Sequence, residues 1–149
     1  MVLTAWLSPG AAQDRTLNFE SDDPEMNAAI RAAQDSLPIF FGSLDQAKDA
    51  AIKVAVPVVG DGPAHEHLWM AECGPSTTKD LACLIANEPE FVALKQGYPY
   101  HLTLDQITDW MFFDGAGRIH GAYTLRAMLP YLDEGEAAAY QTRLAPLPE

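Results

Sequence analysis

The stretch over residues 107–129, ITDWMFFDGAGRIHGAYTLRAML, decides the fold that we expect for this chain. It predicts a strand, a glycine turn over residues 114–117, a short returning strand over residues 118–120 and a helix over residues 123–129. The two glycines of the turn can adopt positive φ, which tight hairpins require. The rest of the chain is expected to hold this hairpin and helix in place.

A helix precedes this stretch near the start of the domain. Asp23 can cap a helix and Pro24 suits its first turn, so residues 24–48 are predicted to be helical, with a bend at Pro38. The apolar residues that follow the cap recur at the spacing of one helical face, namely Met26, Ala29, Ile30, Ala33 and Leu37.

Strands are predicted between that helix and the hairpin. Residues 51–59 alternate, which places isoleucine and valines on the core face and Lys53 on the opposite face of a half-buried strand. Residues 65–73 and 81–86 continue it as an antiparallel meander, and residues 100–103 form a further short strand. The fold class is therefore α+β: an N-terminal helix packed on a curled antiparallel sheet of five to six strands, with a short C-terminal helix.

The chain has 149 residues, which fits one domain with a single core. Its net charge of −12 excludes a typical nucleic-acid-binding surface, because no basic patch is available to neutralise phosphates. No apolar run reaches the roughly 18 residues of a membrane-spanning helix. Such an acidic chain suits a basic partner protein, although a solvated surface also explains the charge.

The chain divides into three parts. Residues 1–22 are expected to be disordered or a remnant signal segment, because a short apolar run leads to a small-x-small pattern at Gly10 and Ala12. Residues 23–130 form the domain, and residues 131–149 form an acidic C-terminal helix and tail. The signal-like start predicts a periplasmic or secreted protein, with a cytoplasmic protein as the alternative.

Two cysteines also bear on the compartment in which the protein resides. Cys73 and Cys83 flank a turn-like run, and a hairpin there would bring them opposite each other. A disulfide between them is then geometrically feasible and expected only in an oxidising compartment; the alternative is two buried thiols.

Four segments taken together resemble a known family. They are EHLW at residues 66–69, ANEP at 86–89, ITDWM at 107–111 and GAYTLR at 121–126, and MNAAIRAA at 26–33 fits as well. In this order and spacing they resemble the bacterial domain-of-unknown-function 2314 family, over about residues 23–129. The resemblance implies a compact α+β domain with a curled antiparallel sheet, and it implies no activity.

Catalytic chemistry has weak support in the sequence. His65 and His67 point the same way along a strand, and a metal site would need a third ligand such as His101 or His120. A small hydrolase or metal-dependent enzyme would use His65, His67 and Asp109. No nucleophile motif or phosphate loop is present, so we predict no catalytic residue, no metal and no cofactor, and an enzyme is the minority hypothesis.

Asp109 is the most informative polar residue. It is predicted to clasp the hairpin to the following helix, by pairing with Arg118 or Arg126 or by contacting the polar start of the helix at Tyr123 and Thr124; capping of the turn at Ile107 is a further alternative. The functional alternative is a binding groove of aromatic and arginine side chains. The candidate binding residues are His67, Trp69, Asn87, Asp109, Trp110, Tyr123, Thr124 and Arg126.

The leading functional hypothesis is a non-enzymatic module that binds a protein or peptide. Its partner would be a basic protein, neutralised in the manner of an immunity protein, and the oligomeric state is left open. The binding hypothesis rests on the aromatic and arginine residues, the acidic charge of the chain and the missing catalytic motifs. The enzyme is one alternative, and a structural envelope or stress protein is the other.

Overall fold

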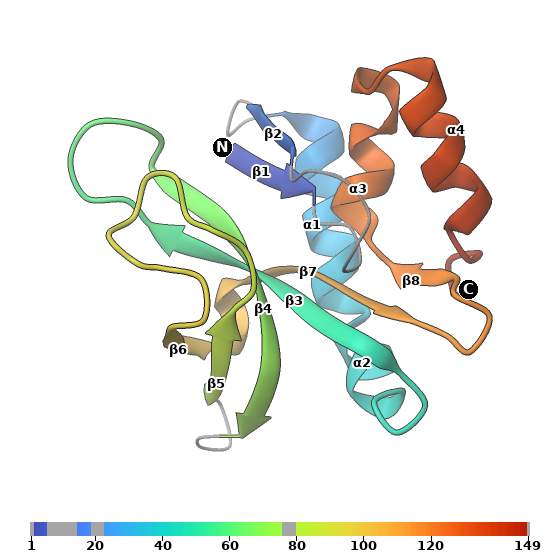
Figure 1. Ribbon diagram of the computed structural model, residues 1–149, viewed down its shortest axis with the longest axis horizontal. Coiled ribbons are helices and arrows are strands. Elements are labelled where there is room, and N and C mark those ends of the chain that lie inside the picture. The colour runs from blue at the N-terminus through green and yellow to red at the C-terminus, as the bar shows by residue number, and fades with distance from the viewer. Residues whose placement is uncertain (1, 6–14, 19–22, 76–79, 149) are drawn as a thin grey trace.

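The computed structural model describes residues 2–5, 15–18, 23–75 and 80–148, which form one mixed α+β arrangement (Figure 1). The helices are α1 (Pro24–Asp35), α2 (Leu37–Gly42), α3 (Tyr123–Met128) and α4 (Glu134–Arg143), with short 3-10 turns η1 (Leu104–Gln106) and η2 (Leu129–Tyr131). The strands are β1 (Val2–Ala5), β2 (Arg15–Asn18), β3 (Lys48–Pro57), β4 (His65–Pro75), β5 (Asp80–Ile85), β6 (Pro99–Thr103), β7 (Ile107–Phe113) and β8 (Ile119–Gly121).

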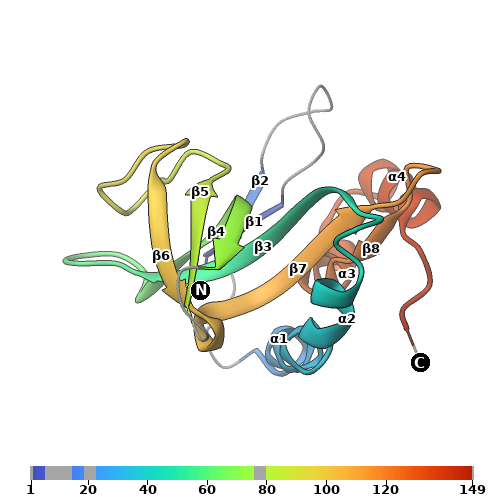
Figure 2. The ribbon, with the colours of Figure 1, turned by 90° about the horizontal axis from the view of Figure 1, so that it is seen from below.

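These strands form one open, strongly curved sheet. Its order is β2-β1-β4-β3-β7-β8, and β5 and β6 extend from β4 on a separate branch. Every pair is antiparallel except β1 with β4. Figure 2 shows α1 and α2 beneath β3 and β7, while α4 lies beside β8. The predicted fold class is confirmed: an N-terminal helix packs on six antiparallel strands from residues 23–130, and a short helix follows at the C-terminus.

The central strands divide their side chains between two hydrophobic clusters, as the alternation of a strand requires. Ile52 of β3 and Trp110 of β7 belong to the first cluster, which includes Phe40 of α2. Ala51 and Met111, one position away on the same strands, belong to the second, which includes residues of α3. The sheet is therefore covered on both faces along β3 and β7, and the strand that we expected to be half-buried is buried on both faces at its centre.

The predicted helix over residues 24–48 is two shorter helices. It begins where expected: Oδ1 of Asp23 accepts a hydrogen bond from the backbone nitrogen of Met26 at 2.7 Å. The helix breaks at Ser36, α2 ends at Gly42, and β3 already begins at Lys48. The expectation of helix up to Lys48 was therefore wrong, because this lysine pairs with Phe113 at the start of a sheet ladder.

The segment expected to be disordered or a signal remnant contains the two short strands β1 and β2. The small-x-small pattern at Gly10 and Ala12 lies outside the described residues. Cys73 and Cys83 are joined in a disulfide across the β4–β5 pair. In the described part of the chain, none of the helices has the length and apolar character needed to cross a membrane.

Candidate functional site

Asp109 lies at the centre of the predicted clasp. Its carboxylate is fully buried in β7 and accepts hydrogen bonds from the backbone nitrogens of Trp110 (2.8 Å), Tyr123 (3.0 Å) and Thr124 (2.9 Å). It also accepts a hydrogen bond from the Thr124 hydroxyl. The first amides of a helix lack partners within the helix, so this carboxylate completes the start of α3. The predicted joining of hairpin and helix therefore exists.

Lys53 is the cation of this cluster, and sequence reasoning missed it. Its ammonium group donates a hydrogen bond to Oγ1 of Thr124 at 2.8 Å and lies 4.8 Å from the ring centre of Trp69. The hydroxyl of Thr124 thus links the lysine to Asp109. Lys53 stands directly opposite Asp109 in the β3–β7 pairing and is only 1% exposed.

Burial shifts the titration of both charged groups. It lowers the pKa of Lys53 to about 8, although the Coulombic attraction of Asp109 acts in the opposite direction. Burial raises the pKa of Asp109, while Lys53 and the hydrogen bonds from Thr124 and Trp110 oppose that rise. Each charge favours the charged form of the other and so opposes the effect of burial, which is the usual condition for tolerating buried charge.

The two arginines that we expected beside Asp109 have other partners. Nε of Arg118 pairs with Asp114 at 3.1 Å. Arg126 donates to the carbonyl oxygens of Gly121 (2.8 Å) and Ala145 (2.6 Å), which ties α3 to the tail. Neither guanidinium pairs with Asp109, because backbone amides and Thr124 occupy its acceptor positions.

The rings of Trp110 and Tyr123 are in contact, with centroids 5.8 Å apart. The indole Nε1–H of Trp110 donates to Oγ of Ser36 at 2.9 Å, which joins the hairpin to the α1–α2 junction. The aromatic and arginine side chains of the expected groove are Trp69, Trp110, Tyr123 and Arg126. The three aromatic residues are 2%, 1% and 8% exposed, in that order. Only Arg126 is partly exposed, so this set forms packed interior rather than an open groove.

The remaining residues from the family-like segments also hold the fold together. Nδ1 of His67 lies 3.0 Å from Oγ1 of Thr108 in the interior. Oδ1 of Asn87 accepts from the backbone nitrogen of Trp69 at 2.8 Å, while its buried Nδ2 has no hydrogen-bond partner in the described structure. Both carboxylate oxygens of Glu66 accept backbone hydrogen bonds from the loop after β5, at Glu90, Phe91 and Val92.

The residues of the enzyme hypothesis do not converge on an open pocket. His65 is exposed, His67 is buried against Thr108, and Asp109 is enclosed beneath α3. His101 lies on β6 and His120 on β8, where it bonds Asp114. Across residues 23–75 and 80–148, no three histidine, cysteine, aspartate or glutamate side chains are grouped as a metal site would need.

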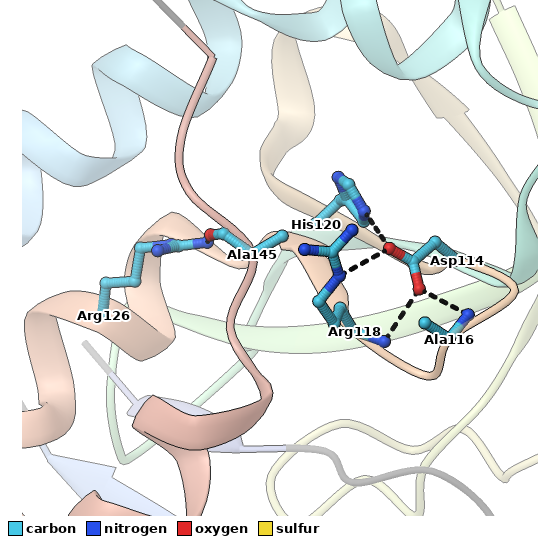
Figure 3. Close-up of polar contacts among 6 residues, drawn as sticks. All are labelled: Asp114, Ala116, Arg118, His120, Arg126 and Ala145. Atoms are coloured by element: carbon cyan, nitrogen blue, oxygen red, sulfur yellow. Dashed lines mark hydrogen bonds and ion pairs between the residues drawn. The ribbon is translucent and has the colours of Figure 1, made fainter.

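One open hollow lies beside the hairpin, and we call it the hairpin cleft. Its volume is about 500 Å³, and β7, β8, the end of α2 and the C-terminal tail surround it. Oδ2 of Asp114 accepts a hydrogen bond from Nε2 of His120 at 2.9 Å at its wall (Figure 3). The lining residues are Ile39, Ser43, Gln46, Trp110, Phe112, Asp114, Gly115, His120, Gly121, Pro146 and Pro148.

A second hollow, which we call the apolar groove, lies on the other side of α2. Its volume is about 450 Å³, and its lining residues are Phe40, Phe41, Leu44, Ala50, Ala51, Ile52, Glu72, Cys73, Gly74 and Leu81. Ile39, Phe41 and Leu44 are 42%, 38% and 43% exposed, and together we call them the α2 ridge. Large apolar side chains gathered at one exposed place are typical of an interaction surface.

The chain was compared with known proteins. The model of the family described as "Uncharacterized protein conserved in bacteria (DUF2314)" matches residues 23–145, which extends the expected resemblance through α4. The chain is similar to the uncharacterized protein YegJ of Escherichia coli (strain K12), at 25% identity over 83% of this chain and 79% of that protein. No solved structure gives a significant match. The extent of the family match shows that this chain belongs to the DUF2314 family of bacterial proteins.

Proposed function

We propose that this domain is a non-enzymatic binding module that recognises a basic, partly apolar segment of a partner protein. The observation that carries the proposal is the α2 ridge, which stands exposed beside the apolar groove. Protein interfaces commonly combine an apolar centre with a charged rim. The site thus lies on α2 rather than on the buried aromatic residues that the sequence suggested.

Carboxylates at the rim of the groove indicate that the partner carries positive charge. Glu72 lines the groove, Asp45 follows the groove residue Leu44, and Asp49 precedes the groove residue Ala50. All three acidic residues are exposed. Together with the net charge of −12, they favour a partner that carries lysine or arginine around an apolar centre.

The backbone at two of these acidic residues supports the same location. Asp49 and Glu72 adopt φ of 49° and 50°, which side-chain-bearing residues adopt rarely. Such conformations cost on the order of 1–3 kcal/mol and are retained most often at functional surfaces. Both residues lie where the register of strand pairing shifts, Asp49 in the β3–β7 pair and Glu72 in the β4–β5 pair.

A labelled synthetic peptide tests the proposal. The peptide carries leucines at positions i, i+3, i+4 and i+7 and lysines elsewhere, and fluorescence anisotropy measures its binding. We expect Phe41→Ser and Leu44→Ser to weaken binding by about tenfold or more, since each removes apolar contact area at the centre of the interface. Val59→Ser is the matched control, because Val59 is 95% exposed and outside the groove.

The charge of the partner is tested with a second peptide that has glutamate in place of every lysine. We expect no binding of this peptide, and weaker binding of the lysine peptide at about 0.5 M salt than at about 0.05 M. Equal binding of both peptides, or equal losses in Val59→Ser and Leu44→Ser, would show that the groove is not a specific site and would refute the proposal.

We also propose that the protein resides in an oxidising compartment, the periplasm or the cell exterior. The Cys73–Cys83 disulfide supports this, because such bonds persist mainly outside the reducing cytosol. Osmotic-shock fractionation of cells that express the natural gene, followed by intact mass measurement, tests it. Recovery of the protein with free thiols in the cytosolic fraction would refute it.

A further inference from the structure

The hairpin cleft contains an imidazole that two contacts hold in one orientation. Nε2 of His120 is 2.9 Å from Oδ2 of Asp114. The imidazole ring also stacks on the ring of Phe112, with centroids 4.7 Å apart and planes 7° from parallel. The side chain of His120 is 31% exposed and lines the cleft, so the fixed ring is accessible from solvent.

Asp114 is itself held by the hairpin loop. Oδ1 accepts hydrogen bonds from the backbone nitrogens of Ala116 (2.9 Å) and Arg118 (3.0 Å), and Oδ2 accepts from Nε of Arg118 at 3.1 Å as well as from His120. The hydrogen bond from His120 and those from the loop lower the pKa of Asp114 well below its usual range. The carboxylate is therefore ionised at neutral pH.

The ionised carboxylate fixes the tautomer of the imidazole. A carboxylate only accepts hydrogen bonds, so neutral His120 carries its hydrogen on Nε2, and Nδ1 has a free lone pair. Figure 3 shows this second ring nitrogen pointing away from Asp114. A neighbouring carboxylate also makes the imidazole a better acceptor.

The other polar side chains in the cleft are acceptors or neutral. Oγ of Ser43 donates its hydrogen to the carbonyl oxygen of Ile39 at 2.7 Å, so it can only accept from a ligand. Gln46 offers a neutral amide, and no lysine or arginine in the described part of the chain lines the cleft, although Arg118 pairs with the wall residue Asp114. Hydrogen bonds between a cationic donor and such acceptors are stronger than neutral ones, particularly with an anion behind the acceptor.

We propose that the hairpin cleft binds an organic cation, a guanidinium or primary ammonium group, which donates a hydrogen bond to Nδ1 of His120. The apolar walls of the cleft would contact the carbon chain that carries the cation. This site shares no lining residue with the proposed peptide-binding groove, although Ile39 of the α2 ridge lines the cleft; Phe41 and Leu44 line the groove and not the cleft. The cation could belong to a free amine or to a basic side chain of another protein.

The test uses ethylguanidinium and butylammonium chlorides as probes, with long-range ¹H–¹⁵N spectra of the histidine rings as the readout. We expect the His120 hydrogen on Nε2, and a saturable shift of its Nδ1 resonance with a dissociation constant of about 1 mM, equal to about −4 kcal/mol. Neutral butyramide should bind at least about tenfold more weakly.

Two variants localise the effect. Gly115→Phe should abolish the shift by filling the cleft, since Gly115 lines it, a β-carbon there meets nothing within 4 Å, and the substitution replaces neither Asp114 nor His120. His101→Phe, at an exposed histidine of β6, should leave the shift unchanged. A hydrogen on Nδ1, an equal response to butyramide, or an unchanged response in Gly115→Phe would each overturn the proposal.

A tripeptide, acetyl-Gly-Arg-Gly amide, distinguishes the two sources of the cation. Binding of the peptide as tight as that of ethylguanidinium supports a basic side chain of a partner as the ligand. Binding of ethylguanidinium alone supports a free amine, since the cleft then excludes a main chain. Absence of binding by both overturns the proposal even if the leucine-lysine peptide binds the groove.

Discussion

Gly121 lies so close to Trp110 that no side chain fits between them. A β-carbon on Gly121 would stand 2.4 Å from Cε3 of the indole and 2.5 Å from the carbonyl oxygen of Trp110. The same carbonyl accepts a hydrogen bond from the backbone nitrogen of Ala122 at 2.8 Å, which closes the turn from β8 into α3. Gly121 has a φ of 75°, so its position depends on glycine for two separate reasons.

Gly121→Ala is expected to lower the free energy of unfolding by about 2–5 kcal/mol, since the left-handed backbone costs about 1–2 kcal/mol and the overpacking about 1–3 kcal/mol. Urea titration followed by tryptophan fluorescence measures this. The matched control is Gly115→Ala, where the added methyl group meets nothing within 4 Å. A similar loss in both variants would contradict the close contact with Trp110.

Asp109→Asn is expected to destabilise the protein by about 3–5 kcal/mol, because it leaves the buried ammonium group of Lys53 without its anion. The double variant with Lys53→Met should recover part of this loss, as the buried charge is then removed. Chemical denaturation of all three variants gives the coupling energy. Asp35→Asn, at an exposed position of α1, should change stability by less than about 0.5 kcal/mol. Additive losses at Asp109 and Lys53 would show that the two groups do not interact.

Glu66→Gln is expected to loosen the loop after β5. The carboxylate accepts hydrogen bonds from the backbone nitrogens of Glu90 (2.6 Å), Phe91 (2.8 Å) and Val92 (3.1 Å), and an amide offers only one acceptor oxygen. Amide hydrogen exchange at these three positions should accelerate, with a loss of about 1–3 kcal/mol in global stability. Exchange in β7 that rises as much as exchange in the loop would contradict this local role.

The lowered pKa of His67 predicts that the protein loses stability in acid. This pKa is lowered to about 3, chiefly by burial, and the charges of Lys53 and His65 act in the same direction. The unfolded chain has a histidine pKa near 6.5, so it binds more protons than the folded protein between about pH 6.5 and 3. Stability should therefore fall as the pH falls through this window, by up to roughly 1.4 kcal/mol per pH unit from this residue.

Denaturation of the wild type and His67→Gln across this range isolates the contribution of His67. The difference in stability should shift in favour of the variant as the pH falls, since glutamine does not titrate. A pH-independent difference would show that His67 is not buried in its neutral form.

Reduction of the Cys73–Cys83 bond should lower the free energy of unfolding by about 3 kcal/mol, the loop-closure value for a separation of 10 residues. Thermal unfolding with and without dithiothreitol measures it. The double variant Cys73→Ser with Cys83→Ser should unfold at the reduced midpoint and show no response to the reductant. A reductant effect that persists in the double variant would contradict a stabilising disulfide.

The regular elements could be predicted because their signals are local. Asp23 and Pro24 marked the start of α1, and the alternation before Pro57 marked β3. The end of the first helix could not be placed in this way. Lys48 pairs with Phe113 in the sheet, and the left-handed backbone at Asp49 directs the chain into β3. A helical spacing pattern reveals neither feature.

The candidate site was predictable in part. The aspartate in the hairpin and the polar residues Tyr123 and Thr124 at the start of the next helix indicated a clasp, and the amides at the start of α3 complete it. Lys53 was missed because alternation assigns a strand lysine to solvent, and its partner lies 71 residues away. The Asp114–His120 pair had a local signal, an aspartate opening a glycine turn, that we did not use.

The C-terminal tail has a consequence for solubility. Leu144 forms a parallel bridge with Ile119, and the backbone nitrogen of Ala145 donates to the carbonyl oxygen of Ile119 at 2.8 Å, so the tail occupies the outer edge of β8. An uncovered strand edge is a template on which other chains can add. Removal of the tail would expose this edge next to apolar β7, and the shortened protein would then tend to aggregate through strand addition.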